Sequence, residues 1–571
     1  MTGLALTIGD RAIHATLRLE KFASGILLKL SSRSLDLIDI AATVYAADAA
    51  VARGGPTDPD MGARWRRRFA LTVPVREPAF WSQPAVRDAL SSTLALLSED
   101  DVAFTFTATT PTRPRSPRLD LAGQQSFRTD EALLFSGGLD SLAGALEEMV
   151  SRRHKVLLVS HRSSTKIQHA QNALIRALGE QVGQSMFRHI PLSLETGQGQ
   201  SREDTHRTRS FFFAAPCAGV VDLWGLDRLR SYENGIVSMT LPISGQVVTT
   251  RATPSTHPAV LSRLSALFTM VFERPIGVDN PLFWKTKTDV VRLIGDLGAG
   301  DLIRLSRRCG ATREMTVMNP HCGVCSQCID RRTAMLAAGV AADDPVSTYD
   351  VDPLRGDRTD GRDREMALGY IEAARRFATM DPRTFFSTYG EAQRAAAHLG
   401  EAPGAAAERL FMLHKRHGEQ VSGVIAEEMR AAVSDQNDDR PGSLSPIALA
   451  VLEKMGGAAP VTTAQSTPPA PDTRPEAAPT HRLSILSNNE IEVTGLGTLS
   501  GASASLLLAL ATQHLGSLGR GLPLEEFPCL TSHQLADTMG VSDETVRRRV
   551  NLARRAIRAL ALDRGGGSAG G

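Results

Sequence analysis

The alternation of apolar and polar residues divides the first part of the chain into short strands and a helix. The segments GILLKLS, RRFALTVPV and DVAFTFTAT alternate with a period of two and contain Val, Phe and Thr, as is typical of β-strands. Residues 84–97 repeat apolar residues at the spacing of one helical face. We therefore predict a strand-rich N-terminal domain over residues 1–125, which ends in the Pro-rich basic connector PTRPRSPR.

A different pattern begins near residue 126. Two short apolar runs, EALLF at 131–135 and KVLLVSH at 155–161, are each followed by a segment with helical spacing. The order strand, helix, strand, helix predicts parallel strands with helices on both faces of the sheet. The predicted fold class is therefore α/β, with a parallel-sheet domain at 126–345.

The remainder of the chain is expected to be helical, then flexible, then compact again. Residues 346–455 are rich in Ala and Arg and have helical periodicity, which predicts a helical region. Residues 456–480 are rich in Pro, Ala and Thr, which is typical of a disordered linker, and the Gly-rich tail at 564–571 is also predicted to be disordered. A small module at 481–563 lies between these two segments.

Composition places the chain among globular proteins and restricts its partners. Of its 571 residues, 42% are hydrophobic and 22% are charged, and a net charge of +2 provides no overall field for nucleic acid or a membrane surface. The N-terminus shows no secretory signal, and no apolar run approaches the ~20 residues that a membrane span requires. We therefore expect a cytoplasmic protein with no membrane partner.

The sharpest chemical signal is the hexapeptide SGGLDS, between the EALLF strand and the next helix. A strand-to-helix turn presents amide groups at a helix N-terminus, where phosphate is stabilised, and glycines let the backbone approach the anion. The aspartate would repel phosphate unless it held Mg²⁺. The alternative is an ordinary glycine turn with a helix cap. The pattern predicts a site for a polyphosphate and a metal ion such as Mg²⁺, built from Ser136, Gly137, Gly138, Leu139, Asp140 and Ser141.

Four of the six cysteines lie between positions 309 and 328. Cys322, Cys325 and Cys328 form two overlapping CxxC steps and, with the more distant Cys309, supply the four thiolates of a closed structural Zn²⁺ site. An iron–sulfur cluster and a redox-active pair remain alternatives, because thiolates serve both. His321 is an alternative ligand to one of the cysteines.

Taken together, these motifs resemble a known enzyme family. SGGxDS resembles the loop of the PP-loop ATP pyrophosphatases, and its combination with C…CGxCxxCxxR resembles the QueC family of 7-cyano-7-deazaguanine synthases. The resemblance extends over residues 128–340. It includes SREDTHRTRSFFFAAPCAGVV at 201–221 and the segments Glu233-Asn234-Gly235, Thr256-His257-Pro258 and Thr286-Lys287-Thr288-Asp289.

The resemblance implies a fold, an activity and site residues. The fold would be the HUP type of PP-loop enzymes. The activity would be that of an ATP-dependent carbon–nitrogen ligase of queuosine biosynthesis, which adenylates 7-carboxy-7-deazaguanine or a related 7-deazapurine acid. Residues 136–141 would bind the phosphates of ATP and Mg²⁺, and Asp140 and Lys287 would be catalytic. Glu233 and Asn234 would line the base pocket, and the four cysteines would hold zinc. The alternatives are a solvated surface lysine for Lys287 and a turn residue for Glu233.

The N-terminal part carries a second resemblance. VYAADAAVARGG, RWRRRFALTVPV and a following FW, ahead of SGGLDSL, resemble the QueC-like proteins of bacterial anti-phage defence systems, of the QatC type. This resemblance implies a protein partner in such a system, to which a deazaguanine would be attached.

The C-terminal module has the pattern of a helix-turn-helix, with or without a wing. TSHQLADTMGVSDETVRRRVNLARRAIRAL at 531–560 reads as a helix, a glycine turn and a second helix. Docking to a protein partner is the alternative to DNA binding. A second hypothesis for the whole chain is therefore a DNA-binding regulator whose PP-loop core senses nucleotide without turnover. The residues placed to meet DNA are Thr545, Arg547, Arg548 and Arg549.

Overall fold

The computed structural model separates the chain into two compact units, Met1–Val461 and Thr462–Gly571. Each unit is described by itself. The structure describes residues 2–8, 11–19, 29–53, 66–109, 127–162, 165–196, 203, 205, 207–242, 254–307, 320–356, 358, 362–434, 483–487, 490–493, 497–500 and 505.

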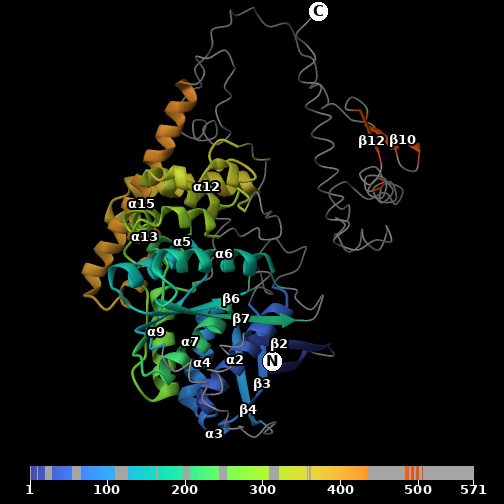
Figure 1. The fold of residues 1–571 in the computed structure, drawn as a ribbon, viewed down its shortest axis with the longest axis vertical. Helices are drawn as coiled ribbons and strands as arrows, with labels where there is room; N and C mark the ends of the chain where they lie inside the picture. The colour runs from blue at the N-terminus through green and yellow to red at the C-terminus, as the bar shows by residue number, and fades with distance from the viewer. Residues whose placement is uncertain are drawn as a thin grey trace, which may run out of the picture. The chain divides into compact units, whose positions relative to one another are not determined.

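The first unit is built on a seven-stranded sheet (Figure 1). Its five central strands are parallel, and β1 and β2 extend it as an antiparallel pair beside β7. This arrangement confirms the predicted α/β fold with a parallel sheet. The strands, in spatial order, are β1 (Thr2–Ile8), β2 (Arg11–Leu19), β7 (Phe187–Thr196), β6 (Val156–His161), β5 (Glu131–Leu134), β8 (Arg228–Ser231) and β9 (Gly277–Asp279).

Helices cover both faces of the parallel sheet, because the central strands are apolar on both sides. All of β6 is buried; Leu157 and Val159 pack into one hydrophobic core, and Val156 and Leu158 pack into another. The first core contains α2 (Ser32–Ala50), α4 (Pro84–Ser98), α7 (Arg209–Leu223) and α9 (Pro258–Phe272). The second contains α5 (Leu139–Leu146), α6 (Thr165–Val182), α10 (Lys287–Asp296) and α11 (Ser326–Ala338). Figure 1 shows α5 and α6 on one side of β6 and β7, with α2 and α7 on the other.

The N-terminal part holds a small parallel pair of strands, β3 (Arg68–Val75) and β4 (Asp101–Ala108). These are the predicted RRFALTVPV and DVAFTFTAT strands, and α4 is the predicted helix that joins them. The segment GILLKLS differs from its prediction: its described end, at residues 29–31, is a turn that leads into α2. Ser31 caps α2 by accepting a hydrogen bond from the amide of Ser34 at 3.1 Å, so the chain turns into a helix there.

Helices follow the sheet along the chain, in agreement with the predicted helical region. They are α12 (Arg362–Thr379), α13 (Pro382–Thr388), α14 (Gly390–Ala396) and α15 (Pro403–Ser434). Short helical elements elsewhere are α3 (Pro78–Trp81), η1 (Glu147–Ser151), α8 (Gly235–Met239), η2 (Gly300–Leu305), η3 (Ala341–Asp343) and η4 (Val346–Thr348). Among the described residues, no helix has both the length and the apolar character needed to cross a bilayer.

The described part of the second unit is a three-stranded antiparallel sheet. It consists of β10 (Leu483–Ser487), β11 (Glu490–Val493) and β12 (Gly497–Ser500). The linker at 456–480 and the helix-turn-helix segment at 531–560, with Thr545 and its three arginines, lie outside the described residues. DNA binding by this module therefore stays a prediction.

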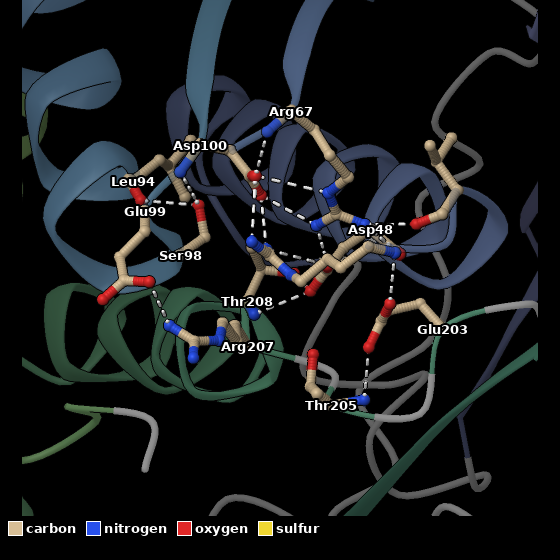
Figure 2. Close-up of polar contacts among 12 residues, drawn as sticks. Asp48, Arg67, Leu94, Ser98, Glu99, Asp100, Glu203, Thr205, Arg207 and Thr208 are labelled. Carbon is tan, nitrogen blue, oxygen red and sulfur yellow. Dashed lines mark hydrogen bonds and ion pairs between the residues drawn. The ribbon is translucent and has the colours of Figure 1, made fainter. Parts of the chain in front are cut away.

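A buried ion-pair network fastens the N-terminal elements to the start of α7 (Figure 2). Arg67 donates to Asp48 and, at 2.7 Å, to Asp100, which also accepts from Arg53 at 3.0 Å. Asp48 in turn accepts from the amide and the hydroxyl of Thr208, each at 2.9 Å, at the N-cap of α7. The charged members of the network are all buried. Because Asp48 binds the N-cap residue Thr208, the network fixes where α7 begins.

Replacing Asp100 with asparagine is expected to lower the free energy of unfolding by about 3–5 kcal/mol, because two arginines would lose a buried charged partner. The neighbouring Asp101→Asn is the control. The Asp101 side chain is 44% exposed and pairs with an exposed arginine, Arg66. Its loss should change stability by about 0–1 kcal/mol. Urea denaturation would measure both variants, and equal destabilisation would contradict a structural role for the buried network.

Candidate functional site

The parallel strands have a switch point between β5 and β8. Along the sheet their order β7-β6-β5-β8-β9 corresponds to third, second, first, fourth and fifth in chain order. The loops that follow the first and fourth strands leave in opposite directions, and α/β proteins bind ligands in the resulting crevice at the carboxyl ends of the strands. The SGGLDS turn follows β5, Glu233 and Asn234 follow β8, and the chain after β9 leads to Lys287.

Three residues from three separate motifs meet at this switch point. Asp140 Oδ1 accepts hydrogen bonds from the backbone amide and the side-chain Nδ2 of Asn234, each at 3.1 Å. The other carboxylate oxygen, Oδ2, accepts from Nζ of Lys287. The three residues are 1%, 0% and 5% exposed for Asp140, Asn234 and Lys287 respectively. They form a buried cluster that contains one acid, one base and one amide.

The turn after β8 holds Asn234 in place. Asn234 caps α8 by accepting a hydrogen bond from the amide of Val237 at 3.2 Å. The next residue must be small, because a Cβ on Gly235 would lie 1.9 Å from the carbonyl oxygen of Phe283. Glu233 is half-buried, and its backbone donates to and accepts from the Asn280 side chain at 3.1 and 2.7 Å. The structure therefore places Glu233 beside the cluster, next in sequence to Asn234.

Lys287 is held at the first residue of α10. Thr286 caps this helix in a capping box with Asp289, where the two side chains accept each other's backbone amides at 3.2 and 3.0 Å. Thr286 Oγ1 also donates to Gln420 on α15, at 2.8 Å. These contacts fix the start of the helix and so the direction in which Lys287 leaves it.

The SGGLDS turn has the tight geometry that its glycines predict. Gly137 adopts a φ of +82°, a conformation that other residues rarely take. Ser141 Oγ donates to the Gly138 carbonyl at 3.0 Å and lies 3.2 Å from Ser136 Oγ, so the two hydroxyls meet across the turn. Ser136 is exposed, whereas residues 137–141 are buried. Within the SGGLDS turn, Ser136 is therefore the residue that is open to solvent, and the other five are enclosed by the protein.

Three of the four predicted zinc ligands form a compact group. The Sγ atoms of Cys322 and Cys328 are 3.8 Å apart, and those of Cys325 and Cys328 are 3.4 Å apart. A tetrahedral zinc site with Zn–S bonds near 2.3 Å separates its sulfurs by about 3.8 Å. The three cysteines could therefore hold a zinc ion. The fourth predicted ligand, Cys309, lies outside the described residues, and the alternative ligand His321 packs its ring on Tyr349 at a centroid distance of 5.1 Å.

Residues that follow the cysteines in the chain bind the turn at Cys322 and Gly323, which we call the cysteine knuckle. The amide of Val351 donates to the Cys322 carbonyl at 3.3 Å, and Arg358 Nη2 donates to the Gly323 carbonyl at 3.0 Å. Gly323 has a φ of +79°, and a Cβ there would lie 1.6 Å from the Val351 carbonyl oxygen. Burial lowers the pKa of Arg358, against the opposing charges of nearby carboxylates and of the Cys322 and Cys328 sulfurs. Sequence reasoning missed Arg358, since no motif marks it.

The arginine of the CxxR motif connects the knuckle to the SGGLDS turn. Arg331 on α11 donates to Asp344 Oδ1 at 2.9 and 2.8 Å and to Ser306 Oγ at 2.9 Å. Arg307, which follows Ser306 in the sequence, donates its backbone amide to the Gly137 carbonyl at 3.0 Å. The possible metal site and the turn therefore share one hydrogen-bonded framework.

A cavity and a buried glutamate lie toward the amino ends of the parallel strands, away from the switch-point crevice. A cavity of about 260 Å³ is lined by residues that precede β6 and β7, among them Met149, Arg153 and Met186. Its volume is below the roughly 300–1,000 Å³ of ordinary ligand pockets. Near the same edge, Glu148 is already bonded to Arg230 and, at 2.8 Å, to Tyr232. Neither feature includes a predicted site residue.

Comparison with known proteins adds nothing to this picture. No family model, curated protein or solved structure matches the chain.

Proposed function

We propose that this chain is an ATP pyrophosphatase of the PP-loop class, with a QueC-like core that activates a carboxylate as its adenylate. The observation that supports it most is the contact of Asp140 with Asn234 and Lys287 at the switch point. The three residues follow three different parallel strands and come from three separate stretches of the family resemblance. A solvated surface lysine would not be buried against Asp140, so the burial of Lys287 argues against that alternative.

In the proposed site, amides, hydroxyls and one lysine of this chain bind the phosphates of ATP. The SGGLDS turn provides backbone amides at the positive end of α5, together with the hydroxyls of Ser136 and Ser141. Lys287 and Asp140 neutralise each other before a ligand binds. A phosphate oxygen offers Lys287 a second acceptor, which leaves the Asp140 carboxylate available to Mg²⁺. When bound, Mg²⁺ supplies positive charge that stabilises the departing pyrophosphate.

The proposed substrate is a 7-deazapurine acid such as 7-carboxy-7-deazaguanine. Its carboxylate oxygen attacks the α-phosphorus of ATP, and pyrophosphate leaves. Ammonia then displaces AMP to give the amide. A second ATP adenylates the amide oxygen with release of pyrophosphate and a proton, and elimination of AMP and the remaining N–H proton gives the nitrile. Glu233 and Asn234 line the base pocket in this account. An amine of a partner protein in an anti-phage system would replace ammonia in the conjugation variant of the reaction.

The test is to incubate the full chain with ATP, Mg²⁺ and 7-carboxy-7-deazaguanine, with and without ammonium. The expected products are AMP and pyrophosphate in equal amounts, formed only when the acid is present. Release of ADP and phosphate would contradict the class of reaction. Absence of AMP across a set of deazapurine acids would remove the proposed substrate.

A further inference from the structure

Arg307 is attached to the SGGLDS turn although no motif marks it. It follows η2, and its backbone amide donates to the Gly137 carbonyl at 3.0 Å. This hydrogen bond places the start of its side chain beside the residue whose positive φ shapes the turn. Arg307 also lies close enough to His321, which precedes Cys322, to interact with it electrostatically.

The guanidinium of Arg307 has a buried donor without an acceptor. Its Nη1 is buried and has no hydrogen-bond partner among the described residues. Burial lowers the pKa of Arg307, and the positive charge of Arg331 lowers it further. Arg331 itself is neutralised by Asp344 at 2.8 Å. Of these two arginines, only Arg331 therefore has a carboxylate partner among the described residues.

Fold stability does not explain such an arrangement. Arg307 as a whole is half-buried, but a buried cationic donor without an acceptor destabilises the folded state, and removing it is expected to be neutral or stabilising. An anionic ligand would supply the missing acceptor. Guanidinium groups suit phosphate in particular, because their donors pair with two phosphate oxygens at once. The amides of the adjoining turn have the same preference for phosphate.

We propose that Arg307 binds a phosphate group of ATP, or of the pyrophosphate formed from it, at the SGGLDS turn. The inference rests on the proposed function, because it places the phosphates on the same turn. The phosphates then meet two cations of this chain, Lys287 after β9 and Arg307 after η2. Arg307 is thus a ligand-binding residue from a stretch of sequence that carries no recognisable signal.

Isothermal titration of the full chain with Mg²⁺-ATP and Mg²⁺-pyrophosphate tests this inference. Arg307→Ala should weaken both ligands by about tenfold to a hundredfold, the loss expected for a charge-assisted hydrogen bond. Arg307→Lys should recover part of that loss, and adenosine should bind both proteins equally. The control is Arg304→Ala, three residues earlier on η2: its side chain is 60% exposed and pairs with Asp301 at 2.9 Å. This control should leave all affinities unchanged.

Thermal unfolding without ligand separates binding from folding. Arg307→Ala should melt at the wild-type temperature or above it, because it removes a buried donor that has no acceptor among the described residues. If Arg307→Ala binds both phosphates as tightly as the wild type, the inference is wrong while the proposed function stands. If the wild type binds neither ligand, both are wrong.

Discussion

Replacing Lys287 with methionine is expected to reduce ATP-dependent AMP release by about a thousandfold, the usual effect of removing a cation that stabilises phosphoryl transfer. The same change should lower the free energy of unfolding by about 3–5 kcal/mol, because Asp140 would be left as a buried charge without its cation. Product analysis would measure the first effect, and urea denaturation would measure the second. Arg292→Met, at an exposed position on the same helix, is the control and should alter neither.

The double variant Asp140→Asn with Lys287→Met separates the two effects. Asparagine at 140 needs no counter-ion and retains an oxygen that can accept from Asn234. The double variant should therefore regain much of the lost stability and still release no AMP. Recovery of activity together with stability would show that Lys287 and Asp140 serve only the fold.

Replacing Cys328 with serine is expected to remove the bound metal and to destabilise the first unit. The binding free energy of structural zinc is about 10–16 kcal/mol in isolated zinc-finger peptides. Losing one of the buried cysteine ligands should therefore remove much of this contribution to the free energy of unfolding. Elemental analysis of the purified protein would give the metal, and thermal unfolding would give the stability. The wild type should contain one zinc ion per chain.

The matched control for this change is Cys217→Ala. Cys217 is fully buried in the first core, where burial raises the pKa of its thiol to about 12, so it is not a thiolate ligand. This variant should keep its zinc. Full metal content in Cys328→Ser would contradict the site, and iron in the wild type would favour the iron–sulfur alternative.

The elements around the SGGLDS turn could be predicted because each has a local signal. The strands β5 and β6 contain short apolar runs, and the helices α5 and α6 have regular apolar spacing. Helix α2 could not be predicted in this way, because it is rich in alanine and buried over most of its surface, so it has no polar face. The pairing of β2 with β7 joins residues far apart in the sequence, which no local pattern reveals.

Some residues of the candidate site could likewise be predicted from the sequence, and others could not. Asp140 stands out within SGGLDS, whereas Asn234 and Lys287 were identified only through the family resemblance. Arg307 and Arg358 were missed, because an arginine with buried donors and no carboxylate partner looks in sequence like any surface arginine. Their burial and their unpaired donors appear only when the chain is folded.

The most direct test of the account is a structure of the protein with Mg²⁺ and a non-hydrolysable ATP analogue. Phosphate oxygens are expected within about 2.7–3.2 Å of amides in the SGGLDS turn, with Lys287 and Arg307 bonded to them. A nucleotide bound elsewhere would contradict it. So would a turn that holds no nucleotide and keeps Lys287 bonded to Asp140 at saturating analogue.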